Sequence, residues 1–336
     1  WMNRISAPNG YELEMRGPHP FAYLVFRPLG WVFNLFTRIP YLSAVLLNTL
    51  TGSLCVFLAW LFIKNQFQNR EYAFLIAALL GLSTSHLFFG SVIESYIFSA
   101  AALIGFFLIL QTRKGSTGLL VTTALLTFGI TLTNFVQNLI GYFISRPRLK
   151  ELIRFAGLTI SFGVLLSMVH AAVYPSAKLF FLPSDAKAEE EFATSLFQEP
   201  SWKIIGRVML LVRTILLYTV IAPRPYFFVE EVGGTFPRFN FFKISPGDFL
   251  LSSYHGLGNM LVMAWGILLL VAGIVFLRNM FRTRRVDLTL AFVFCLLFNF
   301  VLHLNYGYEL FLYFFDWAYA LIFFVAFGLA PLAGNR

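Results

Sequence analysis

Long apolar runs separated by short basic connections restrict what this chain can fold into. Runs such as 41–63, 152–174 and 259–277 are long enough, as helices, to cross the apolar interior of a bilayer. Of the 336 residues, 58% are hydrophobic, 12% are charged and 41 are Phe. Because such a chain would aggregate in water, the sequence predicts an all-α, polytopic helical membrane protein.

The apolar runs predict about nine crossings and two further helices that lie along the membrane interface. The expected crossings are 41–63, 72–89, 96–110, two short helices within 117–145, 152–174, 259–277, 288–304 and 314–332. The first interfacial helix is expected at 21–39, because Pro28 interrupts that run. The second is expected within 202–221, where Lys203 and Arg207 are four residues apart and share a helix face.

The run 117–145 is too long for one crossing and too short for two ordinary ones. Basic residues lie at both ends, with Arg113 and Lys114 before it and Arg146 and Arg148 after it. Positive charge favours the cytoplasmic side, so both ends are expected on one side of the membrane. We therefore predict a hairpin of two short helices with Thr133-Asn134 at its tip.

The charges of the connections predict the topology. The basic connections hold 13 Lys and Arg residues against three carboxylates, Glu71, Glu151 and Asp287, a net charge of +10. The whole chain carries +9, which leaves −1 for the opposite face. The chain is expected to form a single transmembrane domain, 1–336, and the positive-inside rule places its extended segment 175–258 outside. The polar residues gathered on the outer face are Glu12, Glu14, Glu94, Asn134, Glu230, Glu231, Asp248 and Glu309.

Glu94 lies in a short turn, 90–96, between two long apolar runs. An ionisable group at a membrane mouth costs a few kcal/mol unless it is paired or hydrated, so Glu94 is predicted to belong to a functional site. An alternative is that Glu94 begins the next helix, where the helix dipole favours a carboxylate. The two interpretations are compatible.

Other polar residues in the apolar runs carry weaker signals. His86 and His170 are expected to be hydrogen-bonded core residues, whereas His303 lies nearer the outer mouth. Asp316 follows Glu309 by seven residues, which is two helical turns, and is expected to share its face. Asn134 would either cap the second short helix or bind substrate.

Several short motifs occur in a fixed order along the chain. They are Gly17-Pro18-His19-Pro20, then Arg38 and Pro40 ahead of a span, 91–96, 132–134 at the hairpin tip, and 306–309 before the last span. In this order the chain resembles the GT-C superfamily of membrane glycosyltransferases, and it is most similar to bacterial relatives of dolichyl-phosphate-mannose protein mannosyltransferases. Such enzymes have a further span and a catalytic Asp ahead of the His-Pro motif. No Asp precedes His19, so the resemblance implies either a missing upstream span or a replacement by Glu12 or Glu14.

The resemblance implies transfer of a sugar from a polyprenyl-phosphate donor on the outer face of a membrane, here the bacterial inner membrane. The acceptor would be a protein, lipid or glycan, and the membrane lipid itself is a partner. Such transfer needs a base for the acceptor proton and cations or a divalent metal ion for the departing phosphate. The expected bases are Glu12, Glu14 and Glu94, and the expected substrate-binding residues are Arg16, His19, Arg38, Asn134, His303 and Glu309.

The sequence contains no metal-ligand spacing, phosphate-binding loop or nucleophile motif. The basic pI of about 9.6 reflects topology and does not indicate a nucleic-acid partner. Two other classes stay open. A lipid or solute transporter would also gather polar groups in a cavity but usually has paired broken helices, and a non-catalytic membrane protein would need no outer carboxylates.

The charge asymmetry predicts that the segment 175–258 faces outward. A cysteine placed at Ser184 should therefore react with a membrane-impermeant thiol reagent added to intact cells. Reaction only after the membrane has been broken would show that the topology is inverted.

Overall fold

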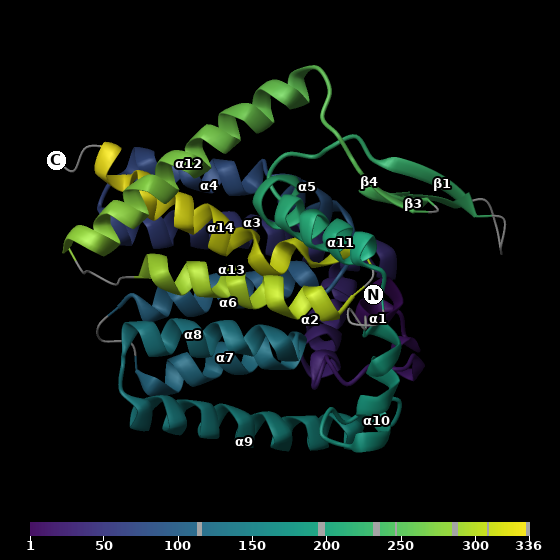
Figure 1. Ribbon diagram of the computed structural model, residues 1–336. Coiled ribbons are helices and arrows are strands. Elements are labelled where there is room, and N and C mark those ends of the chain that lie inside the picture. Colours follow the sequence, from purple (N-terminus) through teal and green to yellow (C-terminus); the bar gives the residue numbers. More distant parts are fainter. Residues whose placement is uncertain are drawn as a thin grey trace.

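The computed structural model describes residues 1–112, 116–193, 199–230, 236–245, 247–283, 288–307 and 309–333. Most of the long helices lie side by side in one bundle (Figure 1). The α-helices are α1 (Met2–Ser6), α2 (Ala22–Thr37), α3 (Pro40–Phe67), α4 (Arg70–Gly81), α5 (Thr84–Ser91), α6 (Tyr96–Leu110), α7 (Thr117–Ile130), α8 (Phe135–Ser145), α9 (Leu149–Val173), α10 (Pro183–Lys187), α11 (Ser201–Arg213), α12 (Leu257–Thr283), α13 (Leu288–Asn305) and α14 (Phe314–Leu329).

Five helices are long and apolar enough to span a membrane: α3, α9, α12, α13, and α14 with its flanking 3-10 turns. The sequence predicted one span at 72–89. Instead, α4 and α5 meet at a 60° bend, so the described residues provide five such helices, or six with the bent pair. The bend has a local cause. The side chain of Ser83 accepts a hydrogen bond from His86 N and starts a new helix there.

The segment 21–39 forms a single helix, α2, which continues through Pro28. This helix packs closely against the short helix α1. A Cβ atom added at Gly30 would lie 2.2 Å from the backbone oxygen of Ile5, so only glycine permits this approach. The side chain of Arg27 donates hydrogen bonds to the backbone oxygens of Ala7 and Pro8 and fixes the segment before α2.

The region 117–145 forms two short antiparallel helices, as its basic ends predicted. Helices α7 and α8 are 14 and 11 residues long and are joined by a 3-10 turn, η2 (Leu132–Asn134). Thr133 and Asn134 therefore lie at the tip of the hairpin. Helix α7 packs between α6 and α9, and α8 packs against α13.

The segment 175–258 contains two structures that the sequence did not predict. Strands β1 (Tyr226–Glu230) and β2 (Phe236–Asn240) form one antiparallel hairpin, and β3 (Phe242–Ser245) and β4 (Asp248–Leu251) form another. The expected helix over 202–221 is also shorter. Helix α11 ends at Arg213, and a π-helical turn, η5 (Thr214–Tyr218), follows it directly.

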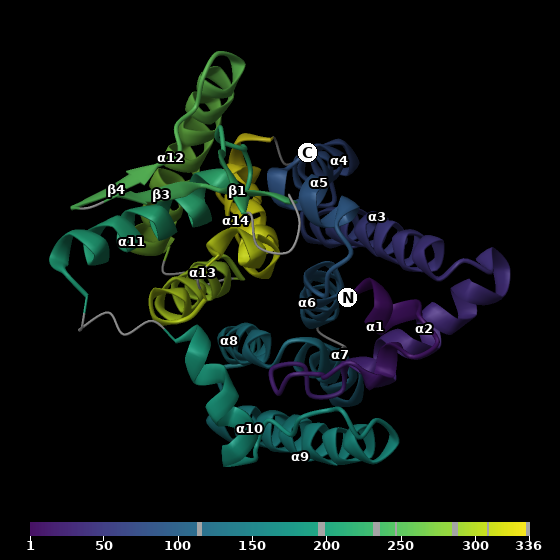
Figure 2. The ribbon, with the colours of Figure 1, turned by 90° about the vertical axis from the view of Figure 1, so that its right-hand side faces the viewer.

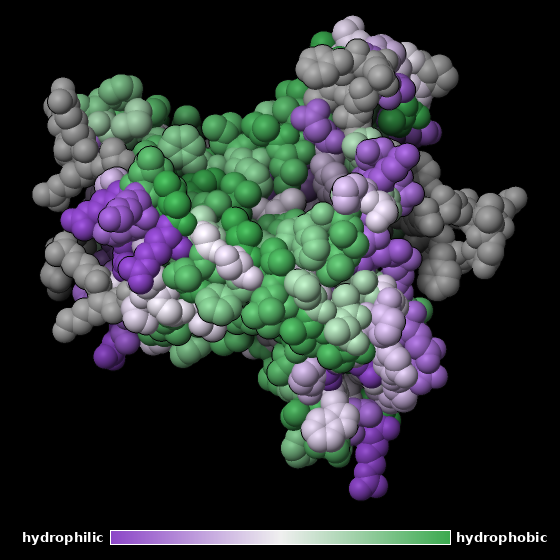
Figure 3. Space-filling model, turned by 90° about the horizontal axis from the view of Figure 1, so that it is seen from below, coloured by the Kyte–Doolittle hydropathy of each residue, from purple (hydrophilic) through white to green (hydrophobic). Residues whose placement is uncertain are grey.

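The connections of the bundle lie at two ends. The turns after α3 and α8 and the end of α12 lie together at one end, which also holds the C-terminus (Figure 1). The α5–α6 turn, the tip of the α7–α8 hairpin, α10 and the end of α13 lie at the opposite end, which we call the site end. An apolar belt separates the two more hydrophilic ends (Figure 3). Exposed apolar side chains of α9 contribute to it: Ile153, Ile160, Phe162, Leu165, Met168 and Val173.

Arg207 of α11 caps the C-terminus of α13 at the site end. Its guanidinium donates hydrogen bonds to the backbone oxygens of His303, Leu304 and Gly307 at 2.7, 2.8 and 2.8 Å. The last carbonyl groups of a helix have no partner within the helix, and a cation near them also complements the helix dipole. Arg207 therefore fixes the turn that follows α13.

Replacing Arg207 with Leu should leave these carbonyl oxygens without their donor and lower the free energy of unfolding by about 3 kcal/mol. The matched control is Lys203→Leu, one turn earlier on α11, where the ion pair with Glu199 is more than one-third exposed. That change should cost less than about 1 kcal/mol. Denaturation of both variants in detergent measures the difference, and equal losses would contradict the capping role.

Candidate functional site

A cavity of about 230 Å³ opens among the helix ends at the site end, and we call it the site cavity. Figure 2 looks onto this end of the bundle. The residues that line the cavity come from five separate parts of the sequence. They are Arg16, Pro18, His19, Tyr96, Thr131, Leu132, Thr133, Glu189, Leu302, His303, Tyr306, Tyr313 and Asp316.

The loop before α2 forms one wall of the site cavity and is bound to the hairpin tip by backbone hydrogen bonds. Leu132 N donates to the oxygen of Pro18 at 2.9 Å, and Phe21 N donates to the oxygen of Gly129 at 3.2 Å. A Cβ atom at Gly129 would lie 2.0 Å from the Phe21 ring, so this close approach requires glycine. The sequence motif around His19 is thus held against the hairpin.

The ring of His19 is oriented by a hydrogen bond to the end of α7 in the same hairpin. Its Nδ1 lies 2.5 Å from the backbone oxygen of Ile130, so the ring donates there and leaves Nε2 as the acceptor. Burial lowers the pKa of His19 to about 4, more than the hydrogen bond to Ile130 raises it. At neutral pH His19 is therefore an uncharged imidazole in the wall of the cavity.

A buried hydrogen-bond network joins the hairpin tip to α14 below the cavity. Asn134 Nδ2 donates to Asp316 Oδ1 at 2.6 Å and to Ser99 Oγ at 2.8 Å. Gln137 Nε2 donates to Asn134 Oδ1 at 2.8 Å and to the backbone oxygen of Asp316 at 3.0 Å. Tyr319 completes the network by donating to Gln137 Oε1 at 2.8 Å. Asp316 is 3% exposed, so its carboxyl group is a fixed polar group within the apolar bundle.

His303 lies at the end of α13 and is 1% exposed. Its Nδ1 is 3.2 Å from the backbone oxygen of Tyr306 and donates to it. Its Nε2 has no hydrogen-bond partner among the residues that the structure describes. A buried polar atom without a partner is costly, and His303 lines the site cavity. The free Nε2 lone pair is therefore available to a molecule bound there.

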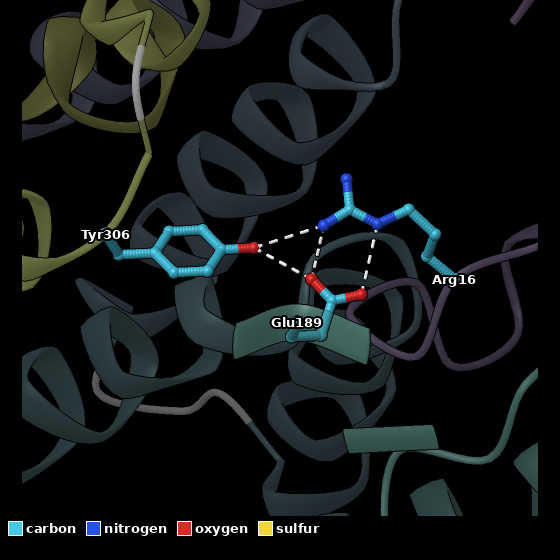
Figure 4. A network of polar contacts seen from close by, with 3 residues as sticks. All are labelled: Arg16, Glu189 and Tyr306. Atoms are coloured by element: carbon cyan, nitrogen blue, oxygen red, sulfur yellow. Dashed lines mark hydrogen bonds and ion pairs between the residues drawn. The ribbon is translucent and has the colours of Figure 1, made fainter. Parts of the chain in front are cut away.

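Three side chains from distant parts of the chain meet at the cavity wall in Figure 4. Arg16 Nε donates to Glu189 Oε1 at 3.0 Å, and its terminal NH2 group donates to Glu189 Oε2. The hydroxyl of Tyr306 donates to the same oxygen of Glu189 at 3.0 Å. Burial, followed by the nearby Glu189, raises the pKa of Tyr306, so the hydroxyl keeps its proton and acts as a donor.

The structure brings some of the predicted site residues together. Arg16, His19 and His303 line the site cavity, although His303 is more than 280 positions from the other two. Asn134 lies behind the wall and holds Asp316. It also contacts Ser99 in the first turn of α6, which follows the Glu94 turn.

The other predicted site residues do not line the site cavity. Glu12 and Glu14 are exposed on the segment before the His19 loop. Arg38 ends α2 in the left-handed conformation and is exposed. Glu94 and Glu309 are partly buried near the cavity, and burial raises the pKa of the Glu94 carboxyl group.

The prediction that Glu309 and Asp316 share one helical face is wrong. Glu309 precedes a 3-10 turn, η6 (Leu310–Tyr313), and α14 begins only at Phe314. The seven-residue spacing therefore does not span two α-helical turns. Tyr308, in the motif 306–309, lies outside the described residues. Glu231, one of the carboxylates assigned to the outer face, also lies outside them.

The sequence did not predict Glu189 as a site residue; it belongs to an acidic run within the segment 175–258. Only the first of the three carboxylates, Glu189-Glu190-Glu191, lines the cavity. The three residues lie in a 3-10 turn, η3 (Ala188–Phe192), whose register decides which side chain points inward. Nothing in the local sequence distinguishes Glu189 from its neighbours.

The site cavity combines a cation, two carboxyl groups, two imidazoles and three tyrosine side chains. Such a set can bind an anionic group, accept a proton and hydrogen-bond to hydroxyl groups. Among the described residues, no group of three His, Cys, Asp or Glu is placed to hold a metal ion. The comparisons with protein-family models, curated proteins and solved structures find no match to this chain.

Proposed function

We propose that the protein is a membrane glycosyltransferase that moves a sugar from a polyprenyl-phosphate donor to an acceptor. The observation that supports it is the composition of the site cavity, which collects Arg16, His303 and Asp316 at one end of an apolar bundle. A lipid-linked donor keeps its chain in the membrane and presents its phosphate and sugar at the end of the bundle. The site cavity opens among the helix ends at one end of the bundle, where such a headgroup would be presented.

The residues of the cavity can be assigned to the parts of this reaction. The acceptor oxygen forms a bond to the anomeric carbon while the bond from that carbon to the phosphate oxygen breaks. The proton of the acceptor hydroxyl passes to His303 Nε2, whose ring is fixed by its hydrogen bond to Tyr306. The electron pair stays on the departing phosphate, and Arg16 stabilises its charge. The Asp316 carboxyl group accepts hydrogen bonds from sugar hydroxyls.

The described basic connections at 64–70 and 146–150 lie at the end of the bundle opposite the site cavity. By the positive-inside rule this arrangement supports an active face directed outward. The resemblance to bacterial enzymes supports a place in the bacterial inner membrane.

A transporter is the second candidate, because the bent pair α4–α5 is a discontinuous helix of the kind that lines transporter sites. No described residue of α4 or α5 lines the site cavity, however, so the bend and the cavity do not form one site. A transporter would also gather polar groups in a cavity, but its discontinuous helix would be expected to line that cavity, so the transferase is the better-supported candidate.

The proposed function predicts that purified protein in lipid vesicles transfers sugar from a polyprenyl-phosphate sugar to a peptide or lipid acceptor. His303→Ala should lower the rate of transfer about 100-fold, because it removes the base that accepts the acceptor proton. Asp316→Asn should lower it as well by weakening the contacts to the sugar. A radiolabelled donor sugar measures the transfer.

The control is Glu71→Gln, on the exposed first turn of α4 at the opposite end of the bundle. It should transfer sugar at the rate of the unchanged protein. Full activity of His303→Ala would exclude His303 as the base. If Glu12→Gln or Glu14→Gln abolished transfer while His303→Ala did not, the base would lie on the segment before the His19 loop.

A further inference from the structure

The ion pair between Arg16 and Glu189 uses the one cation that lines the site cavity in the described part of the chain. Both oxygens of Glu189 accept hydrogen bonds from Arg16, and Oε2 also accepts one from the Tyr306 hydroxyl (Figure 4). Three donors thus converge on one carboxylate. The Arg16 side chain is 37% exposed and the Glu189 side chain 18%, so the contact lies where a molecule from outside can reach it.

An arginine fork binds a phosphate group with the same paired geometry that it uses for a carboxylate. The Tyr306 hydroxyl adds a third donor to the same position. The terminal NH2 nitrogen of Arg16 lies 3.4 Å from the hydroxyl oxygen of Tyr306, so the two groups already lie beside one binding position. The Arg16 guanidinium and the Tyr306 hydroxyl are therefore placed to bind a phosphate group in the cavity. The Glu189 carboxylate now occupies that position.

The segment that carries Glu189 is held at both of its ends by other contacts. At its start, Asp185 accepts a hydrogen bond from Leu179 N at 2.8 Å and lies 3.8 Å from Lys178 Nζ. At its end, Gly307 N donates to the oxygen of Phe192 at 2.9 Å. Glu189 projects from the exposed 3-10 turn between these points, so its carboxylate can leave the cavity while both ends of the segment stay anchored and only the turn between them loosens.

We propose that Arg16 and Tyr306 form a binding site for a phosphate group, which Glu189 occupies until a phosphorylated ligand displaces its carboxylate. The proposal deepens the proposed function, on which it rests, by naming the group that the cavity binds. A phosphate cannot share the fork with Glu189, because two anions would meet around a single cation. The carboxylate is therefore an internal competitor, and it lowers the apparent affinity for phosphate by the fraction of molecules in which it occupies the fork.

Removing the charge of Glu189 should then strengthen phosphate binding. We expect Glu189→Gln to bind inorganic phosphate about tenfold more tightly than the unchanged protein, since an amide competes poorly for the fork. Arg16→Gln should bind it at least about tenfold more weakly than the unchanged protein. Isothermal titration calorimetry in an uncharged detergent measures each dissociation constant.

The matched control is Glu190→Gln. Glu190 is the next residue of the same 3-10 turn, is exposed and does not line the cavity. Its replacement removes the same charge from the same segment and should leave phosphate affinity within about twofold. Gel filtration of the three variants confirms that each is folded and monodisperse.

A second arm uses a polyprenyl monophosphate, without sugar, in vesicles of zwitterionic lipid. If the site serves a lipid headgroup, the same order of affinities holds for the lipid, with tighter binding than for inorganic phosphate. If it serves a soluble phosphate, only inorganic phosphate shows the order. Either result supports the site, and the comparison identifies the source of the phosphate.

Hydrogen exchange on the unchanged protein tests the displacement without any substitution. Saturating phosphate should speed the exchange of the backbone amides of η3, because Glu189 has lost its partners. Unchanged exchange at saturation would overturn the displacement. Equal or weaker phosphate binding by Glu189→Gln, or no binding by any of the proteins, would overturn the site itself.

These results separate the inference from the proposed function. Tighter phosphate binding by Glu189→Gln in a protein that transfers no sugar would leave the phosphate site standing without the transferase. If the protein transfers sugar but Glu189→Gln does not change its affinity for phosphate, the transferase function stands and Glu189 is not a competitor for the phosphate site.

Discussion

The hydrogen bond from Asn134 to Asp316 joins two parts of the chain that are 182 residues apart, and the site depends on it. In an apolar bundle a carboxyl group without partners would be expelled or would distort its surroundings. The amide of Asn134, held in turn by Gln137, gives Asp316 a fixed partner. The tip of the α7–α8 hairpin is thereby fixed against α14, and the site cavity lies above that contact.

The other walls of the cavity follow from similar pairings of backbone groups. The His19 loop uses its backbone to bind the hairpin tip, and Arg207 satisfies the carbonyl groups at the end of α13. Both sets of contacts place an imidazole beside the cavity with one ring nitrogen committed to a backbone oxygen. The polar site thus occupies the region where helix ends leave backbone groups that need partners.

The sequence predicted the features that depend on local composition. Apolar length predicted α3, α9, α12 and α13, and the basic residues at both ends of 117–145 predicted the short hairpin. It missed the bend at Ser83, where one side-chain cap outweighs continuous hydropathy. It also could not select Glu189, because the partners of that residue lie 117 and 173 positions away and depend on the register of a 3-10 turn. Arg16 and His19 were predicted from the family resemblance and His303 from its place near the outer mouth, and their convergence is a property of the tertiary structure.

The central claim is that the site cavity binds the phosphate of a lipid-linked donor. The most direct test is an experimental structure of the protein with a polyprenyl monophosphate in a lipid nanodisc. The account predicts phosphate density within hydrogen-bond distance of Arg16 and the Tyr306 hydroxyl, with the Glu189 carboxylate turned away and the lipid chain against the apolar belt. Phosphate density at the opposite end of the bundle, or an Arg16–Glu189 pair still intact beside bound lipid, would contradict it.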